Sequence, residues 1–199
     1  MNEFNGRKEF NLEIIPAIEK KNGAFSLWKT IQYIVNKAKK NNYDFFILCE
    51  DDHSFTKYYS KNQLIKQITL AQRLGADLMM GGVSWFNTGI EIRKNLFWVD
   101  QFNGLQFTVV FNSFYSAIIS ADFDKGDVPD LKLSEISEKK FVIHPYISLQ
   151  KEFGYSDITY TNNGIGYVSS IFEKSSSSFD LLKKVKCYYE KTRSNYDRF

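Results

Sequence analysis

YDFFILC, residues 43–49, is a short and almost uninterrupted apolar run that ends abruptly in three carboxylates, Glu50, Asp51 and Asp52. A run of this kind predicts a β-strand that is covered on both faces, as in a parallel α/β sheet. In open α/β sheets, ligands bind beyond the carboxyl ends of the strands. The stretch therefore predicts an α/β fold and places a candidate binding site at the end of this strand.

Amphipathic helices are predicted on both sides of this strand. Residues 23–40 carry apolar side chains at spacings of three and four and have a basic last turn, which suits the negative end of the helix dipole. Residues 60–74 show the same spacing, and Gly75 is placed to end the helix. Residues 76–80 then predict a second strand, which leads into Gly81 and Gly82.

The rest of the chain predicts shorter elements. Strands are expected at 12–15, 96–99, 107–111 and 141–143, a short helix at 132–140, and either a strand or a short helix at 114–120. Ser175 to Ser178 read as a polar linker before a basic amphipathic helix. We therefore expect one domain over residues 1–174, followed by the linker and basic helix over residues 175–199.

Composition and charge narrow the possible functions. The chain has 199 residues, 43% of them hydrophobic, which is ample for one packed domain. A net charge of +3 is too small for a protein that coats nucleic acid. Cys49 and Cys187 indicate neither a disulfide framework nor a zinc site, and no run approaches the ~18 apolar residues of a membrane helix. These features favour a cytoplasmic protein.

The acidic triplet suggests metal chemistry. Alternate residues of an extended chain face the same side, so Glu50 and Asp52 can converge on one ligand. Neighbouring carboxylates repel one another unless a cation lies among them, and hard oxygen ligands select Mg²⁺ or Mn²⁺. A divalent ion bound to a diphosphate is the specific hypothesis. The alternative is an acidic loop in which Asp52 or Ser54 caps the next helix.

Two groups of motifs, in this order and spacing, resemble glycosyltransferase family 25, which contains bacterial lipopolysaccharide-type enzymes. The first is a helix start with Leu27 and Trp28, the apolar strand and the acidic triplet. The second is FVIHPYISLQ at 141–150, followed by GYSDI at 154–158. The resemblance spans residues 10–159, and the chain departs from it by lacking the usual first strand.

The resemblance implies a GT-A fold: a Rossmann-like, mainly parallel sheet flanked by helices, here shortened at the N-terminus. It implies a sugar nucleotide bound through Mn²⁺ or Mg²⁺, a saccharide or lipid-linked glycan acceptor, and inversion of the anomeric centre. Inversion in one displacement requires a base for the acceptor hydroxyl, and a carboxylate committed to a cation accepts protons poorly. Asp130 and Glu135 are therefore the candidate catalytic residues, with roles at the start of a helix as the alternative.

The other site residues follow from the same comparison. The metal set is Glu50, Asp52 and His144, although a histidine with a structural role is the more frequent case. The donor set adds residues that either contact phosphate or orient and cap their neighbours: Asp51, His53, Ser156 and Asp157. The acceptor set is Gly81, Gly82 and Trp85, because an aromatic face packs on a pyranose ring and glycines admit close approach.

Other functions remain open on the sequence. Carboxylates at a strand end also serve other metal-dependent phosphate-transfer enzymes, and the many aromatic residues suit an inactive carbohydrate- or partner-binding module. The basic C-terminal helix predicts peripheral contact with an anionic membrane, although such a helix more often packs on its own domain.

Overall fold

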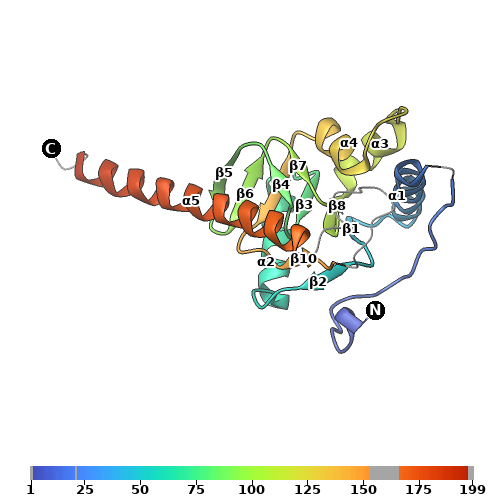
Figure 1. Cartoon of the computed structure of the whole chain (residues 1–199), viewed down its shortest axis with the longest axis horizontal. Helices are drawn as coiled ribbons and strands as arrows, with labels where there is room; N and C mark the ends of the chain where they lie inside the picture. The colour runs from blue at the N-terminus through green and yellow to red at the C-terminus, as the bar shows by residue number, and fades with distance from the viewer. Residues whose placement is uncertain (1, 21, 153–165, 197–199) are drawn as a thin grey trace.

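The fold is a mixed α/β structure built on one six-stranded sheet. A computed structural model of the chain describes residues 2–20, 22–152 and 166–196 (Figure 1). The strands occur in the order β1 (Phe45–Cys49), β8 (Phe107–Phe111), β3 (Leu78–Met80), β9 (Lys140–Ile143), β6 (Leu96–Val99) and β5 (Gly89–Arg93). The predicted strands at 96–99, 107–111 and 141–143 are confirmed within one residue.

The expectation of a mainly parallel sheet is wrong. Only β3 and β9 pair in parallel among the neighbouring strands of this sheet, whereas β8 is antiparallel to both β1 and β3, and β6 is antiparallel to β9 and β5. The apolar run at 43–49 does not reveal strand direction, because an apolar strand can pair with either a parallel or an antiparallel neighbour. In fact β1 lies at the edge of the sheet and is only partly buried, whereas the interior strands β8, β3 and β9 are buried throughout.

Strand direction nevertheless brings three strand ends together. Because β1 and β3 are each antiparallel to β8, and β3 is parallel to β9, these three strands point the same way. Their carboxyl ends lie at one edge of the sheet, where Glu50 follows β1, Gly81 follows β3 and His144 follows β9. This is the edge at which α/β sheets bind ligands.

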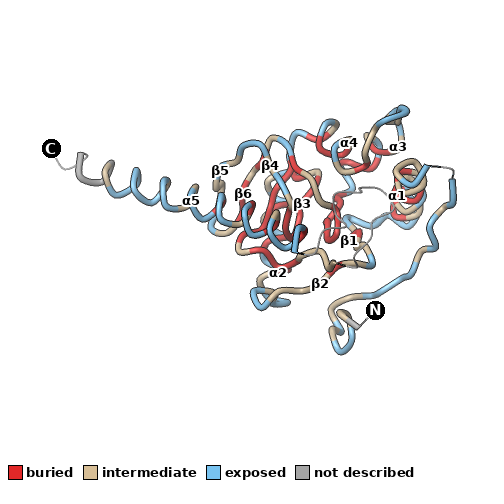
Figure 2. The backbone as a smooth tube through the Cα atoms, viewed as in Figure 1, coloured by how far each residue is buried: buried red, intermediate tan, exposed pale blue. Residues whose placement is uncertain are grey.

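Helices cover both faces of the sheet. One core cluster joins the sheet to α1 (Gly23–Lys40), α3 (Tyr115–Ser120), α4 (Pro129–Ile136) and α5 (Tyr167–Tyr196), and a second cluster joins it to α2 (Lys61–Arg73). The alternation of strand side chains is visible in β3, whose Leu78 and Met80 belong to the first cluster and Met79 to the second. The buried segments in Figure 2 therefore concentrate in the middle layer.

Two short ribbons complete the sheet edge. β2 (His53–Phe55) pairs with β10 (Ser148–Gln150), and β4 (Trp85–Phe86) pairs with β7 (Phe102–Asn103), both antiparallel. Single-turn 3₁₀ helices lie at Asn2–Phe4 and Asn112–Phe114. The segment 114–120 is thus helical rather than a strand, and the predicted strand at 12–15 is irregular, with Leu12 and Ile14 exposed.

The N-terminal boundary of α1 follows its cap. The side chain of Asn22 accepts hydrogen bonds from the backbone N–H groups of Ala24 and Phe25, so the helix begins at Gly23 as predicted. The helix predicted at 132–140 begins earlier, at Pro129, because proline suits the first helical position, where no N–H donor is needed.

The predicted polar linker at Ser175 to Ser178 is wrong, because these serines lie inside α5. Ser175 is buried and bonds to the hydroxyl of Tyr146, 2.6 Å away, while Phe172 and Phe179 hold the helix on the sheet on either side. Beyond this anchor the helix extends away from the rest of the molecule (Figure 1). There, Leu181, Val185, Tyr188 and Tyr189 are exposed.

Within the described ranges, none of the helices combines the length and the apolarity that crossing a bilayer requires.

Candidate functional site

The acidic triplet lies where β1 ends and the chain turns into β2. The backbone N–H of Glu50 donates to the carbonyl of Gln106 at the start of β8, and the N–H of His53 donates to the carbonyl of Glu50. The Lys151 N–H donates to the Asp52 carbonyl at 2.6 Å. The turn is therefore fixed to β8 on one side and to the end of β10 on the other.

Glu50 carries an unusual electrostatic load. Burial, followed by the negative charges of Asp52, Asp130 and Asp51, raises the pKa of its carboxyl to about 8. All of these neighbouring charges are negative, like that of the ionised Glu50 carboxylate. A carboxylate in this environment gains stability from a cation, because a cation offsets both the lost hydration and the repulsion.

Asp52 has one satisfied and one unsatisfied oxygen. The Nε2 amide of Gln150 donates to Oδ2 at 2.7 Å, which orients the carboxylate. Oδ1 is buried and has no hydrogen-bond partner among the described residues. Burial raises the pKa of Asp52 to about 6, against the opposing effect of the Gln150 bond. Asp51, by contrast, is exposed to solvent.

Asp130 approaches this pair from α4. It lies in the first turn of the helix, and its Oδ2 accepts a hydrogen bond from the backbone N–H of Gly104 at 3.1 Å. The predicted alternative is partly right, since the N-cap residue is Val128 but the Asp130 carboxylate does bond to first-turn amides. Burial raises its pKa despite those bonds. Glu50 and Asp130, 80 positions apart in sequence, are thus close enough to influence each other's charge.

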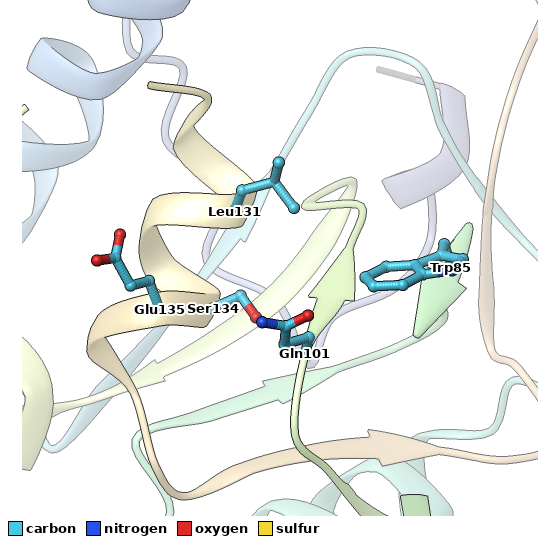
Figure 3. A pocket seen from close by; sticks show the side chains of 5 residues that line it. All are labelled: Trp85, Gln101, Leu131, Ser134 and Glu135. Atoms are coloured by element: carbon cyan, nitrogen blue, oxygen red, sulfur yellow. The ribbon is translucent and has the colours of Figure 1, made fainter. Parts of the chain in front are cut away.

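Glu135 does not join the carboxylates. It is exposed in the last turns of α4 and pairs with Lys132 at 3.5 Å. It lines an open pocket of ≈ 570 Å³ together with Trp85, Gln101, Leu131 and Ser134 (Figure 3). Of the two residues predicted to be catalytic, only Asp130 therefore lies beside the acidic triplet, whereas Glu135 shares a pocket with the predicted acceptor residue Trp85.

His53 is placed away from any phosphate site. It is only 2% exposed, its Nδ1 lies 2.8 Å from the Ser148 hydroxyl, and its ring meets Phe55 edge-on at 4.3 Å. Burial lowers its pKa to about 4, so the ring is neutral at pH 7. Asp52 lies in the turn before β2 and bonds to Gln150, whereas His53 begins β2 and lies against Ser148 and Phe55. The predicted contact with the donor is not supported.

His144 is also separated from the carboxylates. Its Nε2 lies 2.9 Å from Asp180 Oδ1 on α5, and its ring stacks on Phe179 at 5.4 Å. Burial lowers its pKa, with Asp180 acting in the opposite direction. His144 therefore connects β9 to α5, and the predicted metal set of Glu50, Asp52 and His144 is not assembled.

Gly81 and Gly82 are buried, and their lack of side chains has a structural reason. A Cβ at Gly82 would collide with the backbone carbonyl of Ser148, and one at Gly81 would lie 2.9 Å from Phe107. The carbonyl of Gly81 also accepts hydrogen bonds from Ile147 and Ser148. The close approach is made by the chain itself, so this packing does not support the predicted contact with an acceptor. Trp85, in contrast, is 46% exposed.

Ser156 and Asp157, which were predicted to bind the donor, lie outside the described residues.

Several residues of the site escaped the sequence analysis. Gly104 donates to Asp130, and its φ of +117° is a conformation that favours glycine. Gln106 is buried and its Nε2 donates to the Gly82 carbonyl. Gln150 orients Asp52. No local pattern in the sequence singles out Gly104 or Gln106. Gln150 does end the 141–150 motif, but the motif gave no indication that this side chain bonds to Asp52.

The carboxylates fit a divalent ion only in part. In the described part of the chain, no group of three or more His, Cys, Asp or Glu side chains is arranged to hold a metal. Glu50 and Asp52 supply two hard oxygen ligands with uncompensated charge. Two carboxylates fit Mg²⁺ or Mn²⁺ when substrate phosphate oxygens and water complete the coordination shell, which is how Mg²⁺ is commonly held. The residues thus suit an ion that arrives with a diphosphate.

Comparison of the sequence with models of known protein families, and with curated proteins, finds no match to either.

Proposed function

We propose that this chain is a GT-A-type glycosyltransferase that moves a sugar from a nucleotide-sugar donor to a hydroxyl of a saccharide or lipid-linked glycan, with inversion. One observation carries the proposal: at the edge of the sheet where β1, β3 and β9 end, the charges of Asp52 and of Asp130 on α4 both raise the pKa of Glu50. The resemblance of the motifs to glycosyltransferase family 25 supports the same reaction.

Glu50 and Asp52 are the proposed metal ligands. Burial and the neighbouring carboxylates raise the pKa values of both groups, so a cation beside them would favour their ionised forms. A bound Mg²⁺ or Mn²⁺ would stabilise the negative charge of the departing diphosphate. Gln150 holds Asp52 in one orientation through its 2.7 Å bond, which leaves the buried Oδ1 as the oxygen available to the ion.

Asp130 is the proposed general base. It acts electrostatically on Glu50 and is not one of the two proposed metal ligands, so its carboxylate can take the separate role of proton acceptor. Its pKa is raised by burial, which brings its basicity closer to that of a group working near neutral pH. The proton of the acceptor hydroxyl passes to Asp130 while that oxygen bonds to the anomeric carbon and the diphosphate leaves with its electron pair.

A second candidate function is an inactive carbohydrate-binding module. The specific observation in its favour is the Trp85 pocket, which lies apart from the carboxylates and needs no metal. This alternative predicts saccharide binding without turnover of any donor.

The proposal is tested by donor hydrolysis and transfer. We expect activity with at least one sugar nucleotide that requires Mn²⁺ or Mg²⁺ and is lost in Asp52→Asn. We expect Asp130→Asn to lower kcat by a factor of about 10² to 10⁴ while donor affinity stays largely unchanged. Asp122→Asn, an exposed carboxylate in a loop, is the matched control and should behave like the wild type.

Two results would count against the proposal. Unchanged activity in Asp52→Asn would remove the metal assignment. Absence of any thermal shift across a panel of sugar nucleotides with Mn²⁺, which should raise the melting temperature on binding, would favour the binding module.

A further inference from the structure

The pocket between α4 and the β4–β7 ribbon is built as a fixed recess. Two hydrogen bonds hold α4 on the strand: the Phe102 N–H donates to Ser134 Oγ at 3.0 Å, and the Gly104 N–H donates to Asp130 Oδ2 at 3.1 Å. On the other side of the ribbon, Trp85 pairs with Asn103. The position of α4 relative to the ribbon is therefore fixed by two side chains of the helix, Ser134 and Asp130, which accept hydrogen bonds from backbone N–H groups.

The side chains that line the pocket combine a flat apolar surface with hydrogen-bonding groups. Trp85 leaves nearly half of its surface open, and Leu131 lies across the recess from it (Figure 3). The amide of Gln101 lies next to Ser134, on the side that faces Trp85 (Figure 3), and offers both a donor and an acceptor. Glu135 stands at the rim, with its carboxylate turned away from Trp85 (Figure 3).

The charge of the pocket excludes anionic ligands. Among the described residues that line it, the only charged one is Glu135, and none is Lys or Arg. The nearby Lys132 is already engaged by Asp127 at 3.2 Å and by Glu135. A phosphate or nucleotide would meet a carboxylate with no free cation to bind it. A neutral polyhydroxyl ring fits better, because its apolar face stacks on the indole and its hydroxyls bond to the amide.

The position of the pocket relates it to the proposed base. Asp130 and Ser134 are four residues apart on α4, so they lie on the same face about one turn, or ~6 Å, apart along the axis. Asp130 does not line the pocket itself, but it lies one turn of α4 before Ser134, which does. The volume of ≈ 570 Å³ exceeds that of a single hexose and leaves room for a second sugar.

We infer that this pocket is a saccharide-binding subsite in which a neutral pyranose stacks on Trp85 and bonds to Gln101, with one hydroxyl directed along α4 toward Asp130. Saccharide binding stands on the pocket alone, whereas its assignment to the acceptor rests on the proposed function. Glu135 then belongs to the rim of this subsite and is not the base.

The test uses the intrinsic fluorescence of the full chain, titrated with lactose, maltose and N-acetyllactosamine. Trp28 is fully buried and Trp98 is partly buried with its Nε1 bonded to the Glu138 carbonyl, so Trp85 is the exposed reporter. We expect a saturable shift of the emission with at least one disaccharide. Binding is also followed by calorimetry, so that variants without Trp85 can be measured.

Matched variants distinguish a loss of stacking on Trp85 from a general effect of removing an exposed side chain. We expect Trp85→Ala to weaken binding by about tenfold or more and Gln101→Ala to weaken it by a smaller factor, whereas Trp85→Phe retains part of the affinity. Asp122→Asn, at an exposed loop position outside the pocket, should leave both kcat and saccharide binding unchanged. Tyr58→Ala removes an equally exposed aromatic elsewhere and should leave binding unchanged.

Each outcome distinguishes the two hypotheses. Donor hydrolysis without disaccharide binding, or binding that survives both Trp85→Ala and Gln101→Ala, would overturn the subsite and leave the transferase proposal standing. Saccharide binding that depends on Trp85 but occurs without donor turnover would support the subsite and reject the transferase. If Trp85→Ala fails to fold, Trp85→Phe and Gln101→Ala still decide the question.

Discussion

Glu50 shows how a single side chain can be costly for stability and valuable for function. In the folded chain its carboxyl holds a proton up to a pKa of about 8, whereas in the unfolded chain it ionises near its ordinary value of 4.5. Between these two values the folded state binds more protons than the unfolded state, so the free energy of unfolding decreases as the pH rises. The loss is complete above the folded pKa.

We therefore expect Glu50→Gln to stabilise the protein at pH 8 in the presence of EDTA. A glutamine cannot ionise, so the gain should be about 1–3 kcal/mol at pH 8 and should vanish near pH 4. Thermal or urea unfolding at the two pH values measures this difference. The same variant should lose metal-dependent activity, and a variant that is no more stable at pH 8 than the wild type would contradict the charge environment described for Glu50.

At the scale of elements, α5 has an anchored half and an extended half. Phe179 is fully buried, stacks on Phe86 at 4.0 Å and meets Phe97 edge-on at 4.8 Å. Lys186 is the last residue that reaches the body of the molecule among the contacts described, pairing with Glu91 at 3.2 Å. Beyond it, Tyr188 and Tyr189 contact each other and are exposed.

This division predicts different effects for two changes in one helix. Truncation after Cys187 should alter the melting temperature by less than about 2 °C, whereas Phe179→Ala should cost ~3–5 kcal/mol because it empties a packed aromatic site. Differential scanning calorimetry compares the melting temperatures of both variants with that of the wild type. A large loss of stability on truncation would show that the extended half is packed.

Contact of this helix with anionic lipid stays a prediction. A vesicle-flotation assay tests it, with the truncated chain as the control.

At the scale of the whole molecule, the proposed metal site would link metal binding to folding through the carboxylates at one sheet edge. A cation would require Glu50 and Asp52 in their ionised forms, and their pKa values of about 8 and about 6 mean that protons would compete with it at low pH. A bound cation would also offset the repulsion between the ionised carboxylates at high pH.

We accordingly expect Mn²⁺ to raise the melting temperature more at pH 8 than at pH 5. A ligand at 100 times its dissociation constant stabilises the native state by about 2.7 kcal/mol, which corresponds to a rise of several degrees. Differential scanning fluorimetry at the two pH values measures it, with Ca²⁺ as a second ion and the Glu50→Gln, Asp52→Asn double variant as control. An equal shift at both pH values, or one that persists in the double variant, would place the ion elsewhere.

The elements that sequence analysis predicted well are those set by local patterns. The helix at 23–40 follows from its apolar spacing and from the Asn22 cap, and the strand at 45–49 follows from its apolar run. The serines at 175–178 were misread because their local composition resembles a linker, whereas Phe172 and Phe179, one on each side, keep them helical through packing on the sheet. Local propensity is a weak prior where tertiary contacts compete with it.

The sequence by itself determined that acidic side chains would follow an apolar strand in an α/β fold, since hydrophobic patterning and residue order act over only a few positions. Only the tertiary structure decided that Asp130 meets Glu50, that His53 and His144 are enclosed by aromatic rings, and that Glu135 joins Trp85 in a separate pocket. These outcomes depend on contacts between residues far apart in the chain. Which of these distant residues meet depends on the order of the strands and on the docking of α4 and α5 on the sheet. Neither the strand order nor the docking is encoded in a short stretch of sequence.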